Sequence, residues 1–139
     1  KDKSNMLYHE ANVLYWAKAL LKMTYEFIDH TIDSAKELPP FRISHLCFNC
    51  GGTVQSVKSS SMISTMYLAE ELITISLDGD FVKYIHNSDA VPCNLLGPEV
   101  NSIEQFLAFM QHVQYVKTSG QVYISDYQGI FTLTLDSWC

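Results

Sequence analysis

The stretch Phe109–Asp136 constrains the fold more than any other part of the chain. It begins with apolar residues at helical spacing, passes through a Ser-Gly turn, and continues as an alternating strand over Gln121–Ser125. The strand runs into the corner Asp126-Tyr-Gln-Gly, and a second acid, Asp136, follows. This order predicts a helix, a tight turn and extended segments packed against one another.

Two helices are predicted. The first covers Ser4–His30, where apolar residues recur mostly at three- and four-residue steps and no Gly or Pro intervenes. The second covers Ser102–Val116, with Ser102 as N-cap and Gln105 completing a capping box. Its expected buried stripe consists of Phe106, Leu107, Met110 and Val113.

Short extended segments occupy much of the remaining chain, and Cys50-Gly-Gly is expected to form a turn or bulge. The predicted strands are Arg42–Phe48, Val54–Val57, Met66–Ile75 and Phe81–Ile85. Helix, strands, helix and strand pair in this order predict the α+β class, with mixed antiparallel strands and two main helices.

Composition limits the classes of function. The chain has 139 residues, 47% of them hydrophobic, which suits one packed domain spanning 1–139. A net charge of −6 argues against binding to nucleic acid, which requires a basic face. No apolar run is long enough to span a membrane, and no signal peptide is recognisable. Four cysteines in a chain of this length do not predict a disulfide scaffold. We therefore expect a cytoplasmic location.

The corner at Asp126 carries the clearest chemistry. Residues two apart on an extended chain point to the same side, so Asp126 and Gln128 can present a carboxylate and an amide oxygen to one cation. Gly129 allows close backbone approach or a positive φ. Asp136 would add a second carboxylate, and Mg²⁺ takes such groups together with phosphate oxygens. The alternative is a polar β-corner in which Asp and Gly only serve the turn.

The same stretch resembles the catalytic region of the α-kinases, which are atypical Ser/Thr protein kinases. In that family a Phe-x-His-x-x-Tyr helix end, a Gly turn, a strand, Asp-x-Gln-Gly and a further Asp follow one another. The matching residues here, in the same order, are Phe109, His112, Tyr115, Gly120, Asp126, Gln128, Gly129 and Asp136. Tyr67-Leu-Ala-Glu-Glu resembles the linker between the kinase lobes, and the long first helix followed by Pro-Pro-Phe is similar to fungal members.

The resemblance implies a protein-kinase-like core that uses ATP and Mg²⁺ to phosphorylate a protein substrate. Asp126, Gln128 and Asp136 would be the metal-side and catalytic residues. Lys83 would lie near the phosphates, with Asn87 as its polar neighbour. The remaining nucleotide contacts implied by the resemblance are Glu70 and Glu71, which would receive the adenine amino group, and Glu10, which would pair with an ATP-binding lysine.

Departures from the family pattern favour a second interpretation. The family has Leu-Thr-Asp-Pro at the second acid, whereas this chain has Leu133-Thr-Leu-Asp-Ser. The strands with the nucleotide lysine, the Gly-rich loop and a pair of zinc-binding cysteines are absent, and the first residue is not Met. We therefore expect a domain that is incomplete at both ends. The alternative function is a catalytically degenerate pseudokinase that binds a protein partner.

Metal binding other than Mg²⁺ has weaker support in the sequence. His112 aligns with the family's zinc-ligand histidine, but a structural zinc requires four donors and only one aligns, so zinc belongs at most to a full-length domain. Cys47 and Cys50 form a Cys-x-x-Cys pair without a second ligand pair and with Gly-Gly following. Thiols on a strand and turn are the favoured interpretation over a redox or zinc site.

Overall fold

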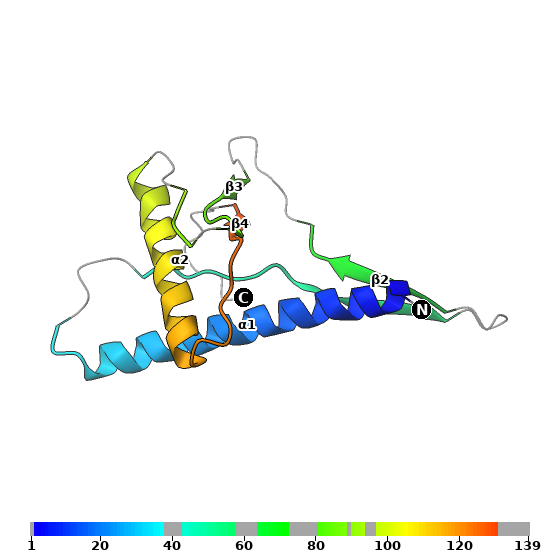
Figure 1. Cartoon of the computed structure of the whole chain (residues 1–139), viewed down its shortest axis with the longest axis horizontal. Coiled ribbons are helices and arrows are strands. Elements are labelled where there is room, and N and C mark those ends of the chain that lie inside the picture. Colours follow the sequence, from blue (N-terminus) through cyan, green and yellow to red (C-terminus); the bar gives the residue numbers. More distant parts are fainter. Residues whose placement is uncertain are drawn as a thin grey trace. The chain divides into compact units, whose positions relative to one another are not determined.

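The structure, a computed structural model, describes residues 2–37, 43–57, 64–72, 81–88, 90–93 and 97–130. The elements follow in the order α1, β1, β2, β3, α2 and β4 (Figure 1). They divide into two compact units, the first made of Lys1–Ala19 with Cys47–Thr74 and the second of Leu20–Leu46 with Ile75–Cys139. Helices together with small antiparallel sheets confirm the predicted α+β class.

Helix α1 spans Asp2–Ser34 and is longer at both ends than the predicted Ser4–His30. Its uninterrupted helical sequence explains this length, because neither Gly nor Pro breaks the backbone hydrogen bonds. In the part that belongs to the second unit, Leu20, Thr24 and Ile28 are buried at four-residue spacing. None of the described helices is both long and apolar enough to cross a membrane.

In the first unit, β1 (Gly51–Val57) pairs antiparallel with β2 (Ser64–Glu70). The prediction of a turn at Cys50-Gly-Gly was wrong, because Gly51 and Gly52 begin β1 opposite Glu70 and Ala69. A Cβ at Gly51 would lie 2.9 Å from Leu14 Cδ2 of α1. A side chain at Gly51 would therefore require the end of the Leu14 side chain to shift. Strand β2 confirms most of the described part of the predicted Met66–Ile75.

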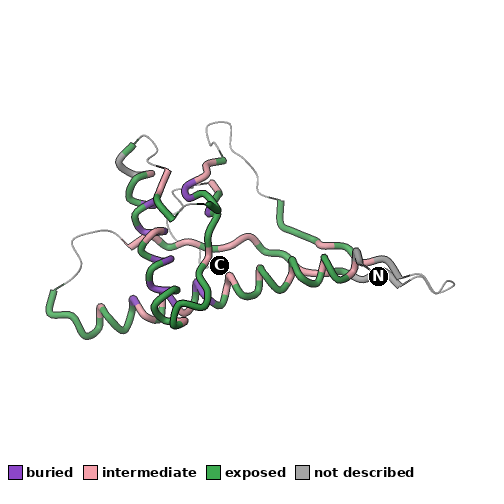
Figure 2. The backbone as a smooth tube through the Cα atoms, viewed as in Figure 1, coloured by how far each residue is buried: buried purple, intermediate pink, exposed green. Residues whose placement is uncertain are grey.

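Helix α2 spans Pro98–Lys117 and begins four residues before the predicted Ser102. Gly97, with φ of 123°, is the N-cap and Pro98 stands in the first turn, where a missing N–H costs nothing. The predicted capping box was wrong because Ser102 lies inside the helix, and Gln105 donates to Asn101 Oδ1 at 3.1 Å instead. The predicted stripe is confirmed, since Phe106, Leu107, Met110 and Val113 are all buried (Figure 2).

The predicted strand Arg42–Phe48 is not formed where the structure describes it. Residues 43–48 have no strand pairing, and the hydroxyl of Tyr25 from α1 takes the place of a neighbouring strand. That hydroxyl donates to Ser44 O at 2.8 Å and accepts from Leu46 N at 2.7 Å. The Tyr25 ring also stacks on His45, with ring centroids 5.8 Å apart. The extended segment therefore lies along a helix rather than in a sheet.

A second small sheet joins distant parts of the second unit. Strand β3 (Val82–Lys83) pairs antiparallel with β4 (Gln128–Gly129). Strand β3 is shorter than the predicted Phe81–Ile85, although Ile85 adds an isolated bridge to Pro92. This sheet positions the corner at Asp126, because it fixes the residues that follow it.

The buried stripe of α2 generates a prediction about stability. Met110 is 0% exposed, so Met110→Ala should lower the free energy of unfolding by about 2–5 kcal/mol through lost transfer energy and a residual cavity. Val116→Ala on the same helix, where the side chain is 57% exposed, is the control and should change it by about 0.5 kcal/mol or less. Urea titration of both variants measures the difference, and equal losses would contradict the assignment of the core.

Candidate active site

The β3–β4 pairing brings Lys83 to the Asp-x-Gln-Gly corner. Lys83 is the backbone partner of Gln128, and its Nζ lies 2.7 Å from Asp126 Oδ1. The two side chains are 38% and 42% exposed, so solvent reaches both. A cation and a carboxylate therefore meet at one accessible place in the second unit, and Gln128 stands opposite Lys83 in the sheet.

The backbone at this corner turns sharply and is fixed on its C-terminal side. Asp126 has φ of +60°, in the left-handed region that Asp and Asn tolerate better than most residues. Tyr127 O accepts hydrogen bonds from Tyr84 N at 2.9 Å and from Ile85 N at 3.3 Å. Asp126 and Gln128 are exposed while Tyr127 is buried, but the left-handed backbone at Asp126 departs from the extended chain on which the same-side expectation rested.

The segment before Asp126 is held by side chains of α2. Thr118 Oγ1 accepts from Val122 N at 3.1 Å and lies 2.8 Å from Val122 O. Ile124 N donates to Gln114 Oε1 at 2.9 Å, and Gln111 Nε2 donates to Ile124 O at 2.8 Å. The prediction of a strand over Gln121–Ser125 was therefore wrong: the chain is extended, but helix side chains satisfy its backbone groups in place of a sheet neighbour.

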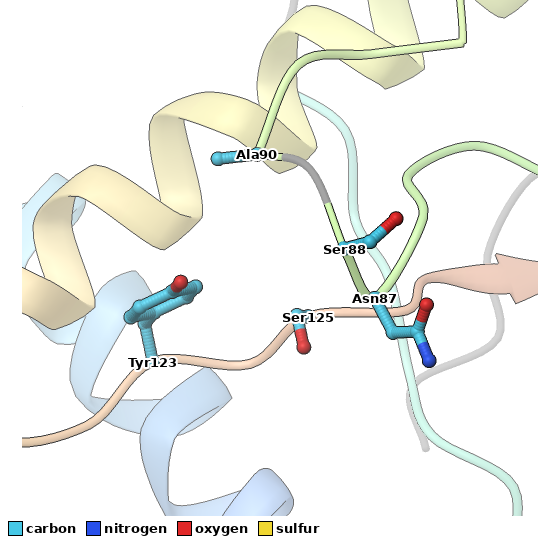
Figure 3. A pocket seen from close by; sticks show the side chains of 5 residues that line it. All are labelled: Asn87, Ser88, Ala90, Tyr123 and Ser125. Atoms are coloured by element: carbon cyan, nitrogen blue, oxygen red, sulfur yellow. The ribbon is translucent and has the colours of Figure 1, made fainter.

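Beside the corner lies a small polar pocket of about 80 Å³. Figure 3 shows its two walls, one from the segment that carries Tyr123 and Ser125 and one from the loop that carries Asn87, Ser88 and Ala90. Sites for drug-sized ligands and cofactors usually measure about 300–1,000 Å³, so this pocket alone is too small for a nucleotide. It places Asn87 across from the residue that precedes Asp126.

The other predicted nucleotide contacts belong to the first unit. Glu10 is exposed on α1, Glu70 ends β2 and Glu71 follows it. Glu71 N donates to Cys50 O at 2.7 Å, Glu71 Oε2 accepts from Cys50 N at 3.3 Å, and Asn49 Nδ2 donates to Glu71 O at 2.8 Å. These bonds fix the linker residue, while Asp136 lies outside the described residues.

The comparisons with known proteins identify the family. A family model described as the alpha-kinase family matches residues 5–136, which is nearly the whole chain. The chain belongs to the alpha-kinase family. That family consists of protein kinases, so the general chemistry associated with this chain is phosphoryl transfer to protein. Neither the search of curated proteins nor that of solved structures found a match.

The oxygen donors at the Asp126 corner suit Mg²⁺ better than zinc. Among the residues that the structure describes, no three His, Cys, Asp or Glu side chains gather as metal ligands. A structural zinc requires such a set, and His112 is exposed on α2, so nothing here supports zinc. Mg²⁺ differs, because it keeps waters and binds through one or two carboxylates plus substrate phosphates. Asp126 with Gln128 fits that pattern.

Cys50 carries a free, exposed thiol directly before β1. A thioredoxin-type Cys-x-x-Cys motif opens a helix and pairs its two cysteines with each other, whereas Cys50 is free and precedes a strand. The favoured interpretation of this cysteine as an ordinary thiol at the start of a strand therefore agrees with its surroundings. The expectation of a thiol was wrong at Cys47, which is disulfide-bonded.

Sequence reasoning missed the two glutamines that hold Ile124. Gln111 is 5% exposed and Gln114 is 0% exposed, although amide side chains are usually found at the surface. A signal was present: both lie at helical spacing with Leu107 and Met110, on the face that the apolar pattern buries. Amide side chains within an apolar stripe indicate that this face of the helix packs against backbone N–H and C=O groups that have no neighbouring strand.

Tyr127, between the two exposed site residues, generates a prediction about pH. Burial raises the pKa of its phenol above the ordinary value of 10.0. Above pH 10 the unfolded chain releases this proton and the folded chain keeps it, so folding loses stability as the pH rises. The free energy of unfolding should fall by up to about 1.4 kcal/mol per pH unit for each such tyrosine.

Denaturant titrations from pH 8 to pH 11 measure this slope. Burial also raises the pKa values of Tyr25 and Tyr84, so Tyr127→Phe should reduce the slope without removing it. Tyr8→Phe, at an exposed position of α1, is the control and should leave it unchanged. A slope that is the same in Tyr127→Phe and in the parent protein would contradict the prediction.

Proposed function

We propose that this alpha-kinase transfers the γ-phosphoryl group of ATP to Ser or Thr residues of a protein substrate, assisted by Mg²⁺. The observation that carries the proposal is the 2.7 Å contact between Lys83 Nζ and Asp126 Oδ1, opposite Gln128. Family membership supports the chemistry in general, and this contact supports the location of the site.

The charges at the corner suit a magnesium-bound triphosphate. Phosphoryl transfer requires little covalent chemistry from the protein and depends on positioning and charge stabilisation. In this proposal, the Asp126 carboxylate and the Gln128 amide oxygen hold the metal side of the nucleotide, and Lys83 faces the phosphate oxygens. Bound Mg²⁺ would neutralise charge that develops on those oxygens. Without nucleotide, Lys83 balances the Asp126 carboxylate instead.

The remaining residues have proposed roles that follow from the family resemblance. Asp136 orients the attacking hydroxyl, and Asn87, in the small pocket, is a polar neighbour of the phosphates. In the first unit, Glu70 and Glu71 are proposed to receive the adenine amino group and Glu10 to pair with a nucleotide lysine.

Asp126→Asn tests the proposal. Asn tolerates the left-handed backbone at this position, so the fold should remain intact while the carboxylate is lost. Phosphate incorporation from γ-labelled Mg-ATP into myelin basic protein should fall by roughly a hundredfold or more, the scale of losing one group that stabilises transition-state charge. The measurement uses the full-length protein, with circular dichroism to verify folding.

Glu26→Gln is the matched control, because it removes a carboxylate from the exposed Lys22–Glu26 ion pair of α1 and should leave turnover unchanged. Turnover of Asp126→Asn at the parental rate would contradict the proposal. A parent protein that binds Mg-ATP in calorimetry without transferring phosphate would instead indicate the degenerate, partner-binding alternative, which the Leu133-Thr-Leu-Asp-Ser departure favours.

A further inference from the structure

We propose that Gln111 and Gln114 of α2 are positioning residues that set the place of Asp126. The inference rests on the proposed function, in which Asp126 carries the metal side of the site. Both glutamines act through Ile124, two residues before Asp126, and neither is part of the family motif on which the site was predicted.

Asp126 lies between two anchored backbone positions. On its N-terminal side, both backbone groups of Ile124 bond to side chains of α2, at 2.9 Å to Gln114 and 2.8 Å to Gln111. On its C-terminal side, Tyr127 O is held by two N–H groups that follow β3. With both sides fixed, the left-handed turn at Asp126 aims its carboxylate at Lys83.

Gln114 is itself held in place by α1. Gln114 is 0% exposed, and its Nε2 lies 3.4 Å from Thr24 Oγ1 of α1. Thr24 is also 0% exposed, and its hydroxyl donates to Leu20 O at 2.9 Å. The chain of contacts therefore runs from the α1 backbone through Thr24 and Gln114 to Ile124. A site whose supporting side chain is buried and hydrogen-bonded in this way is preorganised.

The polarity of each contact explains why amides are required. A neighbouring strand would offer Ile124 one acceptor and one donor, and Gln114 supplies the acceptor while Gln111 supplies the donor. A leucine at either position fills a similar volume but leaves one Ile124 backbone group without its partner. The segment would then shift toward water and move Asp126, and a displacement of about 1 Å at a reacting group costs on the order of a hundredfold in rate.

The kinetic arm compares Gln111→Leu and Gln114→Leu with Gln105→Leu in the full-length protein. Gln105 is exposed on the same helix and bonds only within it, to Asn101, so it is the matched control. We expect kcat for phosphate transfer from Mg-ATP to fall about tenfold or more in the first two variants, with KM for Mg-ATP within about threefold of the parent.

A merely structural role would lower the melting temperature without changing kcat, so rates are compared at a temperature at which circular dichroism finds every variant folded. Unchanged kcat in the folded leucine variants would overturn the proposal. Should leucine prevent folding, Gln114→Asn serves the same comparison, because its shorter amide does not reach Ile124.

The second arm does not depend on activity. Amide hydrogen exchange in the parent protein should find Ile124 N–H protected, and Gln114→Leu should exchange it about tenfold faster or more. Rapid exchange of this amide in the parent would overturn the proposal. A protected amide in a parent that transfers no phosphate would show that the proposed function has failed while the Gln114–Ile124 contact exists.

Discussion

The site depends on how the chain satisfies the backbone hydrogen bonds of the segment that leads to Asp126. Buried and half-buried N–H and C=O groups require partners, and a strand normally finds them in a neighbouring strand. Here Val122 finds them in Thr118, the C-cap of α2, and Ile124 finds them in Gln114 and Gln111 of α2. The buried stripe of α2 determines the rotation of the helix about its axis. That rotation in turn determines the position of the segment.

Stability and chemistry come from different parts of the second unit. The stripe around Met110 removes apolar surface from water, and this burial dominates folding energetics. The Lys83–Asp126 ion pair is about 40% exposed at both side chains, and exposed pairs contribute about 0–1 kcal/mol. Such a pair adds little to the stability of the fold. Because both side chains are exposed, both charges are accessible to a ligand that competes for them.

Helical periodicity predicted both helices and the buried stripe of α2, because each helix satisfies its own backbone and the pattern only has to indicate the buried face. Alternation was less informative at Gln121–Ser125 and at residues 43–48. It indicates an extended chain with one face covered, but it does not reveal what the backbone bonds to, and in both places the partner is a helix side chain. The cap of α2 was misplaced because Ser102 and Gly97-Pro98 both carry start signals, and the earlier one prevailed.

Spacing predicted the candidate acids and amide of the corner, and the family resemblance implied Lys83, but the contact that joins Lys83 to Asp126 was not predictable from either. Asp126 satisfies two requirements at once, a carboxylate and a left-handed backbone, which few residues combine. Gly129 has no positive φ, and its surroundings show no close backbone approach either, so both expected purposes of this glycine were wrong. No described atom lies within 4 Å of a Cβ built at Gly129. A side chain would fit there without strain, so nothing in the structure explains the glycine at this position beside Lys83 and Gln128.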